Sequence, residues 1–343
     1  MSAALIGTGF AQSSGNWAGF IKDAIPKITQ TTTVVIGFFA VLLLVFFLAG
    51  RAKGHFQRPL AILVFLGPAI VLVLVGLVYP AARTFYYSLY GASSKAFVGV
   101  DNYTWAFTDP DMRGVLVNTV LWIIVAPVLS TALGLTLALL IDRMKRESIP
   151  KSLIFLPMAI SFVGASIIWN LVYDYKDPSQ PQTGLLSQVV MWLGVKNPPN
   201  WVLWQPWNNF LLMVIMIWVQ TGFAMVVLSA AIKAIPTEVI EAASIDGAKG
   251  FRLFRAVTIP MIRGTLVVVL TTIMIAVLKI FDIVRTMTGG NFGTQVLSNE
   301  MYSQSFVQFN VGRGSALAVV LFAGVIPLVV YNVIQLRRER ATR

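Results

Sequence analysis

The sequence has no cysteine, a single histidine and few charged residues in a chain of 343. The lack of cysteine excludes a disulfide-stabilised scaffold, and His55 alone offers little from which to build a zinc or haem site. Charged residues make up 12% of the chain, against about 25% in an average soluble protein, whereas apolar residues make up 57%. Because a water-soluble enzyme needs more polar surface than this, the composition argues against that class of protein.

The apolar residues gather into seven stretches, each long enough to cross a bilayer. A hydrocarbon core about 30 Å thick requires roughly 20 apolar residues per helix. These stretches contain only two formal charges, Lys279 and Asp282, and they lie at 33–50, 59–82, 115–141, 152–173, 209–232, 265–284 and 314–335. We therefore expect an all-α integral membrane protein, a polytopic bundle of seven transmembrane helices.

The distribution of basic residues predicts the orientation of this bundle. If the N-terminus lies outside and the C-terminus in the cytoplasm, the inner loops hold 16 of the 26 Lys and Arg residues and the longer outer segments hold 9. This bias follows the rule that cytoplasmic loops are the basic ones. The formal net charge of +12 is thus explained mainly by membrane topology, and nucleic acid is not an expected partner.

The longest inner loop, 233–264, has the pattern of two short helices. Pro236 can open the first helix, Glu238 and Glu241 suit its positive N-terminal end, and Gly247 can end it. In the second, Phe251 and Phe254 share one face, and Pro260 closes the unit before the sixth span. Helices that expose apolar residues with no core of their own are typical of docking to a partner protein, but a helix resting on lipid headgroups has the same pattern.

The loop resembles a conserved motif of a transporter family. Glu241-Ala242-Ala243, then Asp246-Gly247 and Ile259-Pro260, are similar to the "EAA" motif of binding-protein-dependent ABC importer permeases. The glutamate, both alanines and the glycine stand at the family spacing. Val257 stands where the family has isoleucine, and Ile259 where it has leucine.

Further matches extend the resemblance from about Pro59 to the end of the chain. The stretch from Phe97 to Tyr103, followed by Asn118-Thr119, is similar to a stretch of the sugar-permease subfamily, as are Ser152–Pro157 and Thr288-Gly289-Gly290. The maltose and α-glucoside permeases are the most similar type. The resemblance implies a six-helix permease core in 59–343, preceded by a tail and one extra helix in 1–58.

The resemblance also implies the partners of this subunit in a prokaryotic cell membrane. In the family, two permeases form the pore, two ATPase subunits bind on the cytoplasmic side, and an extracytoplasmic binding protein delivers sugar. Carried over, the residues that dock to the ATPase are Glu241, Ala242, Ala243, Asp246 and Gly247. The chain has no Gly-x-x-x-x-Gly-Lys-Ser/Thr motif, so ATP and Mg²⁺ are expected on the ATPase partners. We expect no catalytic, metal or cofactor site in this subunit.

A sugar path requires polar groups inside the bundle, and the spans offer few. The candidates are Asn170, Gln220, Thr221, Lys279 and Asp282, with Trp169, Trp218 and Phe223 as stacking surfaces. By the resemblance to the maltose permease, sugar contacts fall at Met216–Phe223 and Ile275–Lys279. A charge near the centre of a span costs about 2.5–3.5 kcal/mol on insertion scales, so Lys279 needs a function or a partner.

Structural explanations compete with these roles. Lys279 and Asp282 could form an ion pair within one helix, Gln220 and Thr221 could bond to a neighbouring helix, and the tryptophans could serve packing alone. Other functions also remain open: a permease for a solute such as glycerol phosphate, which would suit Lys279, a self-sufficient secondary transporter, or a membrane-embedded enzyme. The two-helix loop argues against a self-sufficient transporter.

Overall fold

The computed structural model describes residues 57–177 and 179–341, together with 25–26, 29–33, 35–41, 43 and 47. The chain divides into two compact units, Met1–Ala82 and Arg83–Arg343. Eight of the 18 residues of the first predicted span, 33–50, lie outside the described residues, as does most of the N-terminal tail. The predicted total of seven spans therefore stays a prediction, and so does the orientation of the termini.

Besides helical residues between 25 and 47, the described part of the first unit contains one long apolar helix, whose last residues belong to the second unit. This helix consists of α3 (Gln57–Val73), a π-helical turn (Leu74–Val78) and α4 (Tyr79–Ser88). The wide turn has a local cause in Pro80, because a proline inside a helix lacks an N–H and its ring collides with the carbonyl four residues earlier. The Tyr79 N–H bonds instead to the Leu74 carbonyl, five residues back.

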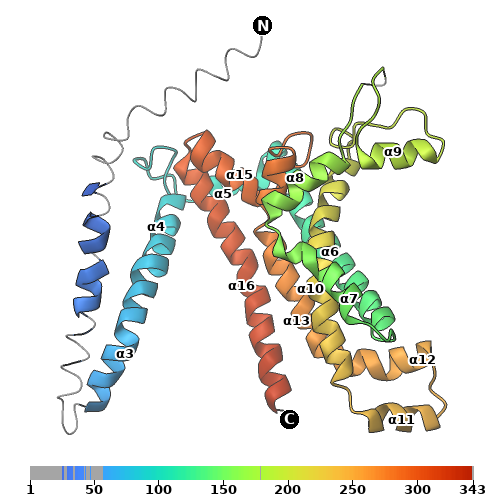
Figure 1. Ribbon diagram of the computed structural model, residues 1–343. Helices are drawn as coiled ribbons and strands as arrows, with labels where there is room; N and C mark the ends of the chain where they lie inside the picture. The colour runs from blue at the N-terminus through green and yellow to red at the C-terminus, as the bar shows by residue number, and fades with distance from the viewer. Residues whose placement is uncertain are drawn as a thin grey trace. The chain divides into compact units, whose positions relative to one another are not determined.

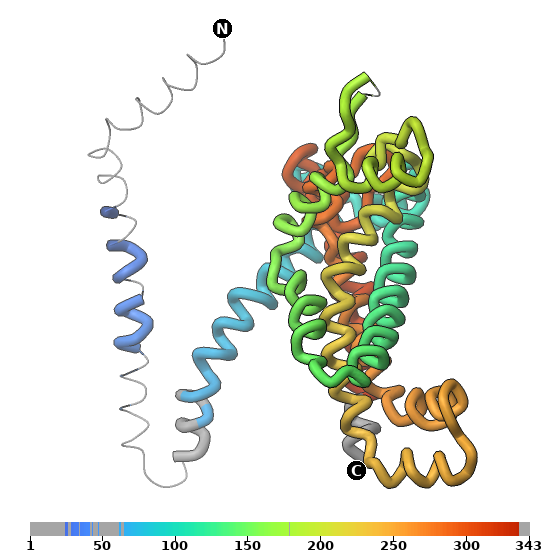
Figure 2. The backbone as a smooth tube through the Cα atoms, turned by 45° about the vertical axis from the view of Figure 1, so that its right-hand side comes forward, coloured from blue at the N-terminus to red at the C-terminus, as the bar shows by residue number. Residues whose placement is uncertain are grey.

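The described part of the second unit is helical, with a single isolated bridge between Tyr90 and Phe97. Figures 1 and 2 show α6, α10 and α13 running along one another, with α11 and α12 at one end of this bundle and α9 at the other. Its helices are α5 (Asp101–Thr108), α6 (Pro110–Ile141), α7 (Ser148–Phe155), α8 (Phe162–Val172), α9 (Leu185–Trp192), α10 (Trp207–Lys233), α11 (Thr237–Ile245), α12 (Phe251–Leu253), α13 (Ile259–Leu278), α14 (Asp282–Met287), α15 (Leu297–Tyr302) and α16 (Val311–Ala341).

Five described helices are long and apolar enough to cross a membrane. They are Phe65–Ser88, Pro110–Ile141, Trp207–Lys233, Phe251–Leu278 and Val311–Gln335. The span predicted at 152–173 is not one straight helix, because Ser148–Ala159 and Phe162–Val172 meet at a bend of 105°. Ser161 caps the second limb by accepting a hydrogen bond from the Gly164 N–H. The pair forms a sixth span if the two limbs are counted together.

The span predicted at 265–284 is wrong at both ends. Its helix begins at Phe251, inside the predicted loop, and a π-helical turn (Phe254–Thr258) carries it past Pro260. Pro260 therefore does not end the helix between the loop and the span. As at Pro80, a π-helical turn before the proline accommodates the missing N–H, and the helix continues. At the other end α13 stops at Leu278, and α14 begins at Asp282. Apart from Lys279 and Asp282, the residues around this break are apolar, so the sequence does not show where the helix ends.

Helix α10 is the most enclosed of the candidate spans. Within an apolar stretch of 18 residues in this helix, 67% is buried inside the protein. The neighbouring helices α6 and α7 approach the backbone of α10 closely where glycine residues lie. A methyl group added at Gly134 of α6 would lie 2.5 Å from Ala224 Cβ and 2.7 Å from the Met225 nitrogen of α10. One added at Gly222 would lie 2.5 Å from the Ile154 carbonyl oxygen of α7. Since real contacts of this kind are longer, glycine is required at both crossings.

We predict that Gly134→Ala lowers the free energy of unfolding by about 1–3 kcal/mol, the usual cost of overpacking a close contact. The matched control is Gly114→Ala in the same helix, where an added methyl group meets nothing within 4 Å. Thermal unfolding of the purified chain in detergent measures both variants. Equal unfolding midpoints for the two would contradict the assigned crossing of α6 and α10.

Candidate coupling loop, charge cluster and amide network

The loop between α10 and α13 holds two helices, as the sequence predicts. Pro236 stands at the N-cap of α11, with Glu238 in its first turn. The helix ends in a Schellman motif: the Gly247 N–H bonds to the Ser244 carbonyl at 3.1 Å, and the Ala248 N–H bonds to the Ala243 carbonyl at 2.9 Å. Gly247 has φ of +82°, a conformation that side-chain-bearing residues rarely adopt. The glycine therefore fixes the turn from α11 towards α12.

The surface of this loop is exposed and largely apolar. Of the five predicted docking residues, Glu241, Ala242, Asp246 and Gly247 are exposed and Ala243 is half-buried. Nearby, Ile245 is 87% and Phe251 74% exposed. Phe251 also lines an open pocket of about 500 Å³ with Arg252, Arg255 and Ala256. The loop thus presents a hydrophobic surface with basic residues beside it.

A cluster of charges lies where α10 meets this loop. The Lys151 ammonium lies 2.6 Å from Asp142 Oδ1 and 3.1 Å from Glu147 Oε2. Ser229 joins the cluster, accepting a hydrogen bond from Lys151 and donating one to Asp142, both at 2.7 Å. Lys233, the last residue of α10, donates a hydrogen bond to Glu147 and lies 4.0 Å from Asp142 Oδ1. Hydrogen bonds from Lys233 and Lys151 lower the pKa of Glu147. The cluster ties the ends of α6, α7 and α10 together.

The residues predicted for a sugar path lie on, or at the end of, helices that contact one another. Asn170 is on α8, Lys279 is the C-cap of α13 and Asp282 is the first residue of α14. The other four are on α10, namely Met216, Gln220, Thr221 and Phe223. Helices α8, α10 and α14 pack against each other in pairs. The set is therefore assembled from distant parts of the sequence, although its members differ in exposure.

Four of these side chains have surroundings that bear on their role. Asn170 is exposed, whereas Met216 is fully buried in the hydrophobic core. Thr221 donates a hydrogen bond to the Ile217 carbonyl of its own helix at 2.6 Å. Phe223 packs at the edge of the core. Asn170 is thus the one of these four that offers a polar group at the protein surface.

The competing explanation for Lys279, an ion pair with Asp282 within one helix, is not what the structure shows. The two residues are not on one helix, because Lys279 ends α13 and Asp282 begins α14. No salt bridge joins them in the part of the chain that is described. Lys279 is instead exposed at the rim of a mainly apolar groove of about 530 Å³, lined by Phe281, Ser298, Met301, Tyr302, Ala318, Leu321, Phe322 and Val325.

The two tryptophans proposed as stacking surfaces pack against each other. The rings of Trp169 and Trp218 meet edge to face, with centroids 5.9 Å apart, and Tyr173 lies 5.2 Å from Trp169. Both tryptophans are half-buried at the edge of the core. The packing accounts for their position.

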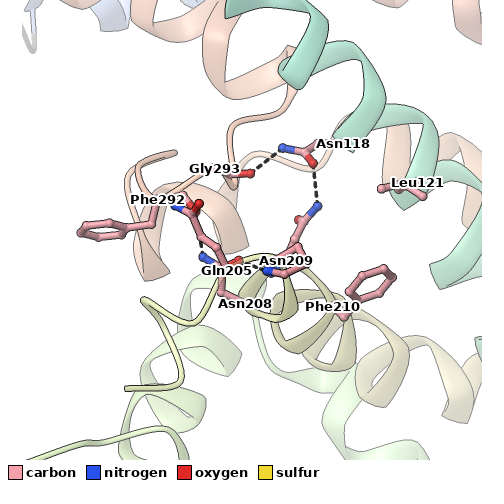
Figure 3. Close-up of a pocket in the computed structure, with 9 residues that line it drawn as sticks. Asn118, Leu121, Gln205, Asn208, Asn209, Phe210, Phe292 and Gly293 are labelled. Atoms are coloured by element: carbon pink, nitrogen blue, oxygen red, sulfur yellow. Dashed lines mark hydrogen bonds between the residues drawn. The ribbon is translucent and has the colours of Figure 1, made fainter. Parts of the chain in front are cut away.

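Amide side chains form a hydrogen-bonded network at the end of the bundle opposite the loop α11–α12. The sequence did not predict this network. Figure 3 shows Asn118 of α6 donating to the Gly293 carbonyl, at 2.7 Å, and accepting from Asn209 of α10, at 2.9 Å. Asn208 donates to the Phe292 carbonyl at 2.8 Å, and the buried Trp122 N–H donates to Asn209 at 2.8 Å. These residues surround a small pocket of about 130 Å³.

This network explains two of the family-like stretches. In Asn118-Thr119, the first residue holds the carbonyls of Gly293 and Gln295, and the Thr119 hydroxyl accepts from the Leu297 N–H at 2.9 Å. The glycine-rich turn after Thr288 is thereby tied to α6. The resemblance of both stretches was visible in the sequence, but nothing in the sequence indicated that they meet, or that Asn208 and Asn209 complete the network.

The stretch around Phe97–Tyr103 has a comparable structural role. The Asn102 amide donates to the carbonyls of Ser88 and Tyr90, each at 2.8 Å, and the Tyr103 hydroxyl lies 2.6 Å from Ser88 Oγ. These contacts fasten α5 to the end of α4.

These features define a multi-pass membrane protein built to contact partners outside the bilayer. It has several membrane-length helices, an exposed two-helix loop at one end and a polar loop held by hydrogen bonds at the other. The chain belongs to the family of binding-protein-dependent transport system inner membrane components, whose model matches residues 131–343. The resemblance indicated by Glu241–Gly247 is confirmed. The protein is therefore a permease subunit of an ABC transport system.

Two relatives show the degree of similarity. The chain is 48% identical to an alpha-glucoside transport system permease protein of Rhizobium meliloti over 276 residues, which cover 80% of this chain and 82% of the relative. It is 47% identical to an osmoprotective compounds uptake permease protein of Synechocystis over 276 residues, which cover 80% of this chain and 99% of the relative.

Solved structures support the fold. A bacterial ABC transporter involved in import of the acidic polysaccharide alginate includes a chain that matches with a TM-score of 0.70 at 20% identity. The match covers 82% of this chain and 96% of that one.

We predict that Asn118→Leu loosens the loop 289–297, because it removes two hydrogen bonds to loop carbonyls and leaves the Asn209 amide without its acceptor. Hydrogen–deuterium exchange of the loop amides should rise by about tenfold or more, since each bond contributes about 0.5–1.5 kcal/mol and tenfold corresponds to 1.4 kcal/mol. Thr136→Val is the control, because that hydroxyl bonds only within α6. Unchanged exchange in Asn118→Leu would show that the network does not hold the loop.

Proposed function

We propose that this permease subunit forms half of the pore of an ATP-driven importer for carbohydrates of the α-glucoside class. A second permease would complete the pore, two ATPase subunits would bind ATP and Mg²⁺ on the cytoplasmic side, and an extracytoplasmic binding protein would deliver the sugar. The observation that carries the proposal is the exposed loop α11–α12, together with membership of the family. This chain would itself bind no nucleotide.

The form of the loop favours a protein partner over lipid headgroups. A helix that lies in the headgroup region needs one continuous apolar face, with basic residues reaching past it. Here α11 has nine residues, its first turn is acidic, and the Gly247 turn holds it at a fixed angle to α12. The exposed Ile245 and Phe251 suit a hydrophobic groove, and Arg252 and Arg255 suit an acidic rim on the ATPase.

The proposed substrate class rests on the relatives and on the residues of the candidate path. One relative of 48% identity is named for alpha-glucoside transport, and a similarly close one for osmoprotective compounds. The exposed Asn170 offers hydrogen bonds to hydroxyl groups, and Lys279 and Asp282 offer charge-assisted ones. Gln220 and Thr221 are secondary candidates. An anionic solute such as glycerol phosphate is the second candidate, because Lys279 is exposed and has no acidic partner among the described residues.

We predict that Gly247→Val reduces uptake of labelled maltose at least about tenfold while the chain still inserts into the membrane. Valine disfavours a positive φ, so the turn between α11 and α12 would open. Gly247→Asn is the matched control, because asparagine adopts this conformation more readily. Uptake in native cells and the amount of permease in the membrane fraction are the measurements. Normal uptake by Gly247→Val would refute a coupling role for the turn.

Competition tests the substrate class. An excess of unlabelled maltose or trehalose should suppress uptake of labelled maltose, and an excess of glycerol 3-phosphate should leave it unchanged. The reverse ranking would favour the anionic solute. Transport by vesicles that contain this chain alone, driven by an ion gradient, would contradict the ATP-driven assembly.

A further inference from the structure

The charge cluster at the base of α10 contains an unused hydrogen-bond acceptor. Asp142 Oδ1 interacts with Lys151 and Ser229, but Asp142 Oδ2 is buried and has no hydrogen-bond partner. A buried carboxylate oxygen without a partner is costly, because it has lost water and gained nothing in exchange. We therefore expect a hydrogen-bond donor to reach Asp142 Oδ2 in another state of the protein.

Lys233 is the donor within reach. Its ammonium lies 4.0 Å from Asp142 Oδ1, and it is at present bonded to Glu147. The Lys233 side chain is 47% exposed, so it is not fixed by packing, whereas the Asp142 side chain is only 12% exposed. Lys233 thus lies between two carboxylates. It bonds to the carboxylate of Glu147, whereas the carboxylate of Asp142 has one oxygen without a hydrogen-bond partner.

The two carboxylates belong to different structural elements. Asp142 is the C-cap of α6, and Glu147 is the N-cap of α7. Lys233 ends α10, three residues before the Pro236 N-cap of α11. A small displacement of the loop would therefore move Lys233 from the start of α7 to the end of α6, or back again.

The structure also links this position to the candidate path. The Gly222 crossing brings the backbone of α10 against Ile154 and Phe155, so the end of α7 follows α10. Beyond the 105° bend, α8 carries Asn170 and contacts α14. A shift at the start of α7 can thereby reach α8, which follows α7 in the chain.

We propose that Lys233 is a two-position residue that couples the loop to the path: it bonds to Glu147 in one state of the transporter and to Asp142 in the other. This inference rests on the proposed coupling function of α11–α12. Lys233 is a positioning residue that would not touch the transported solute. Each state stabilises one arrangement of α7 against α6, and the movement of the loop selects between them.

The lack of cysteine in the chain provides a direct test. Asn170→Cys creates a single thiol on α8, whose rate of labelling by a membrane-impermeant maleimide can be followed in the assembled transporter in native cells. Glu147→Gln should drive Lys233 to Asp142, and Asp142→Asn should keep it on Glu147. The two variants should move the labelling rate in opposite directions from the parent, each by roughly fivefold, the factor that corresponds to about 1 kcal/mol.

Controls separate this exchange from simple damage. Lys145→Met removes an exposed charge from the same turn and should leave the labelling rate unchanged. With Lys233→Met as background, adding Glu147→Gln should have a much smaller effect than in the parent, because it then removes only the bond of Glu147 to Lys151. This arm holds even if Asp142→Asn does not insert. Shifts in the same direction for Glu147→Gln and Asp142→Asn, or an undiminished effect of Glu147→Gln without Lys233, would overturn the proposal. The labelling requires no known solute, so failure of maltose uptake would count against the proposed substrate and not against Lys233.

Discussion

The close packing of α10 against its neighbours is the constraint on which the rest of the structure depends. Two glycines allow α6 and α7 to approach its backbone so closely that a single methyl group at either crossing would collide. Because α10 is held in this way, its two ends are fixed in relation to each other. At one end, Asn208 bonds to the Phe292 carbonyl and Asn209 bonds to Asn118, which holds the loop 289–297. The other end carries Lys233 and leads into α11.

The breaks in the helices lie where function is expected, and they follow from the demands of a lipid environment. Irregular backbone at membrane depth is tolerated only where protein or water satisfies its polar groups. The bend at Ile160–Ser161 meets this demand with the Ser161 cap, and the break after Leu278 places a lysine at an open groove. Both prolines that follow a π-helical turn, Pro80 and Pro260, show the opposite outcome, since there the helix continues. The chain thus leaves the helical path at Ser161 and after Leu278, where a polar side chain is available. It stays helical at Pro80 and Pro260, where only a proline interrupts the hydrogen bonding.

Hydropathy and local sequence signals predicted the positions of most described spans and the two-helix loop, because both depend on short-range pattern. They missed the bend within 152–173 and the ends of the helix predicted at 265–284. The Gly247 turn and the extent of α11 follow from residues within one turn of the helix. The break between Lys279 and Asp282 was missed because apolar residues lie between and on both sides of these two charges, so the stretch still has the pattern of one span. The amide network was also missed, because it joins Asn118, Asn209 and Gly293 across long separations in sequence. For Lys279, the alternative of an intrahelical pair is removed, and the residue is an exposed cation at a helix break.

The central claim is that the loop α11–α12 binds the ATPase of the transporter, and cross-linking from the loop tests it most directly. Ile245→Cys would place a photoactivatable probe on the most exposed apolar side chain of α11 in an otherwise cysteine-free chain. The account predicts that illumination of native membranes yields an adduct with a nucleotide-binding subunit, identified by mass spectrometry. Adducts with lipid alone, in membranes that contain the assembled transporter, would contradict it.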